Sequence, residues 1–171
     1  GCYGYDKATT PNIDALAEEG ILFEQTTTQT PLTLPSHSSI FTGLIAPRHG
    51  VRHNGTFTLD ESHRTLAEAL TDSGYDTAAF ISAFVLDKRF GLAQGFATYD
   101  DRVDPRKVGA KGDGTFQERD ATAVTDAAIA HIESRKSSAR PLFTWVHYFT
   151  PHQPYSPPQK YKRLHPGRPY D

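Results

Sequence analysis

The pattern of apolar and polar positions divides the chain into alternating helices and strands. Apolar Ile13, Leu16 and Ala17 follow helical spacing, Pro11 suits a first helical position, and Gly20 can end the helix. The same reasoning predicts further helices over 36–42, from Thr65 to Gly74 and over 116–135, strands over 21–29, 76–84 and 141–149, and loops over 46–55 and 100–115.

This order of elements predicts an α/β fold with a mainly parallel sheet, because helices that alternate with strands serve as crossovers between parallel neighbours. Ligands of such sheets bind outside the carboxyl ends of the strands. Thr33 and His152 each follow a predicted strand. We therefore expect the two residues at one edge of the sheet, although they are far apart in the sequence.

Composition is that of an ordinary globular chain. The 171 residues are 37% hydrophobic and 22% charged, with a net charge of −2, which gives no reason to expect nucleic acid or an anionic membrane as the main partner. No apolar run reaches the length of a membrane span. Cys2 is the only cysteine, so no internal disulfide can form. A start at Gly1 and the absence of Met indicate part of a longer protein.

The stretch PLTLPSHSSIFTG, residues 31–43, carries the candidate chemistry. Thr33 lies where the predicted helix begins, and unpaired N–H groups and the helix dipole favour an anion there. A threonine hydroxyl becomes a nucleophile when a base or metal ion activates it. The competing interpretation is that Thr33 and its neighbours only cap a short helix.

Four segments together resemble the sulfatase family of the alkaline phosphatase superfamily. They are TPNIDALAEEGILF (10–23), TLPSHSSIFTGLIAPRHGVRHNG (33–55), LAEALTDSGYDTAAF (66–80) and PLFTWVHYFTPHQPY (141–155). The resemblance implies an alkaline-phosphatase-like parallel sheet flanked by helices. It also implies that residues 1–171 are a partial catalytic domain, truncated at both ends, because the family is considerably longer.

The family motif has Cys or Ser, any residue, then Pro, Ser and Arg. Thr33 stands at the position of the Cys or Ser, Pro35 and Ser36 match, and His37 replaces the Arg. Formylglycine is made from Cys or Ser, so the resemblance points to the phosphate-handling relatives instead. It implies that Thr33 attacks phosphorus or sulfur and forms a covalent ester, with phosphodiester or phosphate ester hydrolysis favoured over formylglycine-type sulfate hydrolysis.

The resemblance assigns roles to three further residues, each with an alternative. Asn54 matches an Asn that holds a non-bridging substrate oxygen, but Asn-Gly is also a strong turn signal. His152, in PHQP, matches a His that reaches the anionic group, or it is an exposed loop residue. His37 either binds the anion in place of the missing Arg or lies on the helix surface. His147 is more typical of a core residue or one that supports the site.

The resemblance also implies a divalent metal ion, zinc, calcium or manganese. Thr33 is the one ligand candidate here, and most ligands lie outside this chain. The family places Lys and His after the strand that matches 76–84, where this chain has Ser82 and Phe84. The wall of the site is therefore less cationic than in a sulfatase, which favours a different ester.

The sequence thus predicts a metal-dependent ester hydrolase acting on a small anionic substrate, with no nucleic acid as a structural partner. Two alternatives stay open: a phosphoethanolamine-type transferase using the same Thr33, and a non-catalytic anion-binding member of the family. We expect no turnover from residues 1–171 alone, because an unactivated threonine is a poor nucleophile.

Overall fold

A three-stranded parallel sheet organises the chain. The computed structural model describes residues 1–5, 10–102, 118–153, 155 and 159–162. The strands are β1 (Asp76–Phe80), β2 (Thr98–Asp100) and β3 (Leu142–Val146), in the order β2-β1-β3. Both pairings are parallel, which confirms the predicted α/β architecture. The central strand β1 is bonded on both sides, so its backbone groups are satisfied within the sheet.

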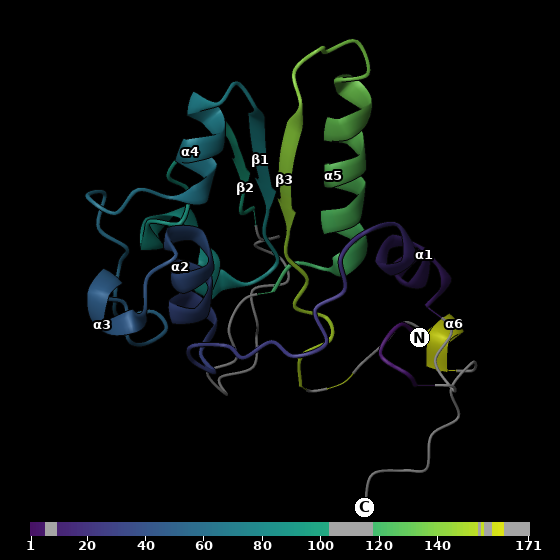
Figure 1. Cartoon of the computed structure of the whole chain (residues 1–171), viewed down its shortest axis with the longest axis horizontal. Helices are drawn as coiled ribbons and strands as arrows, with labels where there is room; N and C mark the ends of the chain where they lie inside the picture. Colours follow the sequence, from purple (N-terminus) through teal and green to yellow (C-terminus); the bar gives the residue numbers. More distant parts are fainter. Residues whose placement is uncertain (6–9, 103–117, 154, 156–158, 163–171) are drawn as a thin grey trace, which may run out of the picture.

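Helices cover both faces of this sheet (Figure 1), with α2 (Thr33–Thr42) and α4 (Leu66–Asp72) on one side and α5 (Ala121–Ser134) on the other. Successive side chains of β1 point to opposite faces. Ala78 and Phe80 pack with Val124 of α5, while Ala79 packs in the core cluster that contains Leu34 of α2. The last three residues of β1, Ala78 to Phe80, are therefore apolar and buried, as a sheet covered on both faces requires.

The remaining elements are short, apart from α1, and connect these layers. They are α1 (Pro11–Glu19), α3 (Ala46–His49), η1 (Phe84–Leu86), η2 (Lys88–Phe90) and α6 (Gln159–Lys162). The buried His49 joins α3 to α2, because its Nε2 lies 3.0 Å from the Ser39 hydroxyl and its Nδ1 accepts from the Val51 N–H. No helix among the described residues is long and apolar enough to cross a membrane.

The strand predicted over 21–29 is absent. The segment pairs with none of the described strands, and Ile21 and Phe23 are exposed. β-branched and aromatic residues raise strand propensity, but a strand forms only where a neighbour takes its hydrogen bonds. The segment instead makes a local hydrogen bond, between the hydroxyls of Thr28 and Ser36, which lie 3.1 Å apart.

The loop predicted over 46–55 instead begins with the short helix α3, because Pro47 suits a first helical turn and Gly50, with a φ of 80°, ends it. The other predicted helices and strands are present, with different ends. β1 ends at Phe80 rather than 84, and β3 ends at Val146 rather than 149. The helix predicted over 116–135 begins at Ala121, where the Asp120 carboxylate caps it by accepting from the Thr122 N–H; 116 and 117 lie outside the described residues. Most of the loop predicted over 100–115 lies outside them too, and its first residue, Asp100, ends β2.

Candidate active site

Helix α2 begins at Thr33, three residues earlier than predicted. Leu32 is its N-cap residue, and its carbonyl accepts the first helical bond from the Ser36 N–H at 2.9 Å. Pro35 is therefore the third helical residue rather than the first, a place where its missing N–H costs nothing. Thr33 lies inside the first turn and is half-buried.

Almost all backbone N–H groups in the first turn of α2 already have a hydrogen-bond partner. The Leu34 N–H is bonded, Pro35 has none, and the Ser36 N–H belongs to the helix. Among the described residues, nothing accepts from the Thr33 N–H. The helix dipole persists at this end, but one free backbone donor remains for an anion rather than several.

The amide of Asn54 lies directly beside the candidate nucleophile. Its Oδ1 accepts from the Leu34 N–H at 2.9 Å, over the peptide that follows Thr33. An N–H can bond only to the amide oxygen, so this contact fixes which way the amide faces. Its Nδ2 then carries two donors that no described residue uses. The bond to Leu34 places Asn54 at the first turn of α2, next to the backbone of Thr33.

His37 lies one turn further along α2 and folds back onto Thr33. Its Nδ1 is 2.8 Å from the Thr33 carbonyl oxygen. A carbonyl only accepts, so Nδ1 carries the proton and Nε2 of the neutral ring is a lone pair. Burial lowers the pKa of His37, against the opposing effect of this hydrogen bond. At neutral pH the residue thus presents no permanent charge where the family motif has Arg.

An aromatic cluster anchors this turn to the carboxyl end of β3. The His37 ring lies 5.2 Å from the Trp145 ring and 5.3 Å from the His147 ring, edge-on to the latter. The Phe41 ring packs edge-on to the Trp145 ring, with 4.7 Å between the two ring centroids. The rings hold the N-terminal turn of α2 over the strand end, where the parallel sheet predicts a ligand site.

His147 continues the ladder of β3, since its N–H donates to the Phe80 carbonyl at 2.9 Å. Burial, reinforced by the charge of His37, lowers the pKa of His147 to about 4. Its Nδ1 is buried without a partner among the described residues. His147 therefore acts as a neutral packing residue beside His37 at ordinary pH.

His152 lies after β3 and is exposed. Its ring stacks on Phe149 at 4.4 Å, its backbone N–H donates to the Phe149 carbonyl at 2.7 Å, and its Nδ1–H donates to the Gln153 carbonyl at 2.7 Å. Its Nε2 makes no hydrogen bond among the described residues. No contact found among the described residues joins His152 to Thr33, His37 or Asn54, so the structure places it at the same end of the sheet without joining it to them.

Ser82 and Phe84 serve the framework. The buried Ser82 hydroxyl donates to the Arg119 carbonyl, and the Ser82 carbonyl accepts from the Arg119 N–H at 2.8 Å. Phe84 packs edge-on to Phe90 beneath the guanidinium of Arg89. Sequence reasoning named Ser82 but missed its partner, because Arg119 follows a long polar stretch with no periodic signal.

The described residues do not form a metal site of their own. They contain no cluster of three or more His, Cys, Asp or Glu side chains placed to hold an ion. The expected role of Thr33 as a metal ligand therefore has no supporting ligands in the described part of the chain.

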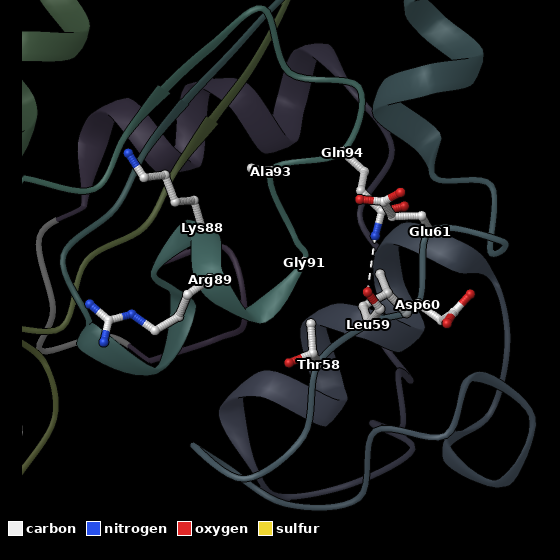
Figure 2. Close-up of a pocket in the computed structure, with 9 residues that line it drawn as sticks. All are labelled: Thr58, Leu59, Asp60, Glu61, Lys88, Arg89, Gly91, Ala93 and Gln94. Carbon is white, nitrogen blue, oxygen red and sulfur yellow. Dashed lines mark hydrogen bonds between the residues drawn. The ribbon is translucent and has the colours of Figure 1, made fainter.

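A hollow in the described residues lies elsewhere, between the loop at Leu59 and η2. It encloses about 530 Å³. Figure 2 shows that the charged ends of Lys88 and Arg89 point away from Gln94, and Arg89 is paired with Asp87. Polar groups do not converge on this hollow, and it is lined by none of the residues described at the start of α2.

Comparison with known proteins gives consistent results. The family model "Sulfatase" matches residues 1–169. An N-acetylglucosamine-6-O-sulfatase of Bacteroides thetaiotaomicron is 28% identical over 91% of this chain, which corresponds to 28% of that protein. A sulfatase of Escherichia coli, YidJ, is 25% identical over 94% of this chain and 37% of its own length. The chain thus spans about a third of the length of these relatives.

Solved structures show the same fold. One, in complex with its substrate D-glucosamine-2-N,6-O-disulfate, has a TM-score of 0.71 and 27% identity over 91% of this chain and 32% of its own. A phosphonate monoester hydrolase of Agrobacterium radiobacter has a TM-score of 0.70 and 24% identity, over 95% of this chain and 40% of its own. The alkaline-phosphatase-like fold predicted from the sequence is confirmed.

Proposed function

Because this chain belongs to the sulfatase family, we propose that it carries the nucleophile of an ester hydrolase that attacks sulfate or phosphate esters with Thr33. Phosphodiester hydrolysis is the favoured activity within this class. The Thr33 Oγ gives up its proton to water and attacks phosphorus or sulfur in line; the bond to the leaving-group oxygen breaks with its electron pair on that oxygen, and water then hydrolyses the Thr33 ester.

The contact between Asn54 and the Leu34 N–H carries this proposal. It supports a role for Asn54 that goes beyond a turn, because the bond occupies the amide oxygen and leaves both Nδ2 donors without a partner among the described residues. Amide donors fixed in advance stabilise charge that develops on a non-bridging oxygen during attack. A turn residue would require none of this geometry.

The charge of the site favours a singly charged ester. Where the family motif has a permanent cation, His37 is neutral at pH 7 because burial lowers its pKa. Ser82 and Phe84 stand where the family has Lys and His. Phosphodiesters and sulfate monoesters carry one charge, whereas phosphate monoesters carry two, and the second charge has fewer cations to meet here.

The metal that the family implies is held, in this proposal, mainly by residues outside the described ones. Thr33 is the one contribution of this chain. When bound, a divalent ion supplies charge stabilisation and lowers the pKa of a coordinated oxygen. The described residues position Thr33 and the oxyanion donor.

The test is an assay of the full gene product with zinc, manganese or calcium. Bis(4-nitrophenyl) phosphate, 4-nitrophenyl phosphate and 4-nitrophenyl sulfate are compared as substrates. We expect the diester to be cleaved best and Thr33→Ala to reduce kcat more than about a thousandfold. Thr58→Ala, an exposed threonine in the hollow, is the matched control. Full activity in Thr33→Ala would overturn the proposal.

A further inference from the structure

The segment that carries Asn54 is hydrogen bonded to α2 at two points. At one point the Asn54 Oδ1 accepts from the Leu34 N–H at 2.9 Å. At the other, the Nε2 of His49, the last residue of α3, lies 3.0 Å from the Ser39 hydroxyl. Leu34 and Ser39 both belong to α2, and α3 lies beside that helix (Figure 1). Residues 50–53 therefore form a loop that leaves α2 at one contact and returns to it at the other.

The two ring nitrogens of His49 have different and fixed roles. Nδ1 accepts from the Val51 N–H at 3.2 Å. A ring nitrogen that accepts carries no proton, so the proton of the neutral ring resides on Nε2 and is donated to the Ser39 hydroxyl. The side chain is only 2% exposed, which leaves no room for water to replace either partner. Ser39 thereby stabilises the tautomer that the Val51 N–H requires.

The His49 ring is neutral at ordinary pH. Burial lowers its pKa, and the charge of a protonated His63, which precedes α4, acts in the same direction. The other titratable side chain of α2, His37, is bonded to the Thr33 carbonyl. The remaining cationic or titratable side chains of α3 and the loop are the exposed Arg48, Arg52 and His53.

Val51 connects the His49 ring to the rest of the loop. Its side chain is fully buried in the core cluster that also contains Leu34 and Phe41 of α2. Gly50, with a φ of 80°, turns the chain between His49 and Val51. Asn54 follows three residues after Val51, so a bond that fixes the Val51 backbone also restricts where the Asn54 amide lies.

We propose that His49 is a positioning residue for Asn54, and that its tautomer, stabilised by Ser39, holds the loop in the conformation that presents the Asn54 amide next to Thr33. The role of Asn54 in catalysis rests on the proposed function, whereas the holding of the loop does not. A residue that only filled the space between α3 and α2 would need neither of the two hydrogen bonds of the ring.

Ser39→Ala tests the proposal in the full gene product, with bis(4-nitrophenyl) phosphate as the substrate. Without its acceptor on Nε2, the ring shifts its proton to Nδ1, which then faces the Val51 N–H donor to donor. We expect kcat to fall about tenfold and KM to change less than about twofold, because the Asn54 donors act on charge that develops in the transition state. Unchanged kcat, or a loss confined to KM, would overturn the proposal.

Ser38→Ala is the matched control. Ser38 is the neighbouring buried serine of α2, and its hydroxyl donates to the Leu34 carbonyl within the helix rather than to the loop. We expect Ser38→Ala to keep the wild-type kcat. An equal fall in Ser38→Ala and Ser39→Ala would assign the loss to the helix and overturn the role of the ring.

Rescue by a conservative variant separates positioning from packing. His49→Asn keeps an acceptor for the N–H two residues on and has no tautomer to stabilise, whereas His49→Leu keeps bulk alone. We expect His49→Leu to lower kcat about tenfold and His49→Asn to retain at least about half of it. Ser39→Ala should cost nothing further in the His49→Asn background. Losses that multiply in this double variant would show that Ser39 does not act through the ring.

Amide hydrogen exchange of the full gene product, followed by mass spectrometry over residues 50–55, tests the loop without turnover. We expect Ser39→Ala and His49→Leu to speed exchange of the Val51 amide about fivefold, with exchange in α5 unchanged. Unaltered exchange at Val51 would overturn the proposal. If the wild type cleaves no ester, the proposed function fails, and the exchange rates still decide whether His49 holds the loop.

Discussion

At the scale of single residues, the amide of Asn54 combines an observed contact with a proposed one. Its oxygen holds the first turn of α2 through the Leu34 N–H, and in our proposal its nitrogen binds substrate. The sequence offered a turn residue and an oxyanion donor as alternatives. A substitution that keeps the acceptor and removes the donor distinguishes them.

We expect Asn54→Asp to remain as stable as the wild type, because a carboxylate oxygen still accepts from the Leu34 N–H and favours the helix N-terminus. Its activity should fall at least about a hundredfold, since the donors are lost and a negative charge faces the anion. Asn54→Ala should instead lower the free energy of unfolding by about 1 kcal/mol. Urea unfolding and kcat/KM measure the two effects; a fully active Asn54→Asp would exclude the donor role.

His37 stands where the family motif has Arg, and in our proposal it sets the charge preference of the site; His37→Arg places a permanent cation there. We expect His37→Arg to raise kcat/KM for 4-nitrophenyl phosphate, relative to the diester, by about tenfold. The guanidinium can still stack on Trp145, which limits the cost in packing. The ratio of the two kcat/KM values is the measurement, and an unchanged ratio would mean that His37 does not face the substrate.

At the scale of elements, α2 has no side-chain cap of its own. Its start is held from outside, by Asn54 and by the rings of Trp145 and His147 on β3. This explains why sequence reasoning placed the start at residue 36: Pro35 was the strongest local signal, and the residues that hold Thr33 in helical conformation come from elsewhere in the chain.

Trp145 is the central ring of this cluster and the only tryptophan. We expect Trp145→Ala to lower the free energy of unfolding by about 3 kcal/mol, because Phe41, Phe96 and His37 all lose a packing partner. Trp145→Phe should cost less than half as much. Urea unfolding followed by circular dichroism measures both, and a loss below about 1 kcal/mol in Trp145→Ala would show that the cluster does not anchor α2.

Helix α4 is capped locally, in contrast with α2. The buried Thr65 hydroxyl accepts from the Glu68 N–H, and the Glu68 carboxylate accepts from the Thr65 N–H. We expect Thr65→Ala to lower the free energy of unfolding by about 1–2 kcal/mol, whereas Thr65→Ser keeps most of it. Thermal unfolding of the two variants tests this, and equal losses would point to the methyl group rather than the hydroxyl.

Elements that depend on local signals, like α4, were predicted more accurately from the sequence than elements that depend on distant partners, like α2. Local signals placed α1, α4, β1 and β3 correctly to within a few residues, and Thr65 was recognised as a helix start. The strand over 21–29 was wrong and the three-residue β2 was missed, because pairing depends on neighbours that periodicity does not reveal. Asn54 was placed beside Thr33 through resemblance, whereas Arg119 gave no signal at all.

At the scale of the whole molecule, the free energy of unfolding depends on pH through two groups that are buried or partly buried, the imidazole of His147 and the carboxylate of Asp100. Burial lowers the pKa of His147 to about 4, from a usual 6.5, while hydrogen bonds from Arg102 lower that of Asp100 to about 2, from 3.8. Both groups bind fewer protons when folded than when unfolded. The stability from His147 is therefore present above pH 6.5 and lost toward pH 4, and that from Asp100 is present above pH 3.8 and lost toward pH 2.

We expect the free energy of unfolding of the wild type to fall by about 1 kcal/mol more between pH 7 and 5 than that of His147→Phe. Phenylalanine keeps the ring in the cluster and removes the unpartnered Nδ1. The fall is reduced rather than abolished in the variant, because burial also lowers the pKa of His37 and His49. Urea unfolding at the two pH values is the measurement, and parallel losses would assign the sensitivity to other groups.

The aromatic cluster joins parts of the chain that a ribosome delivers far apart in time. Thr33, His37 and Asn54 are synthesised before α5, whereas Trp145 and His147 follow α5 in the chain. Until then the nascent helix has no strand end to rest on. The hydroxyl that we assign to catalysis is thus made well before the strand end that fixes its setting.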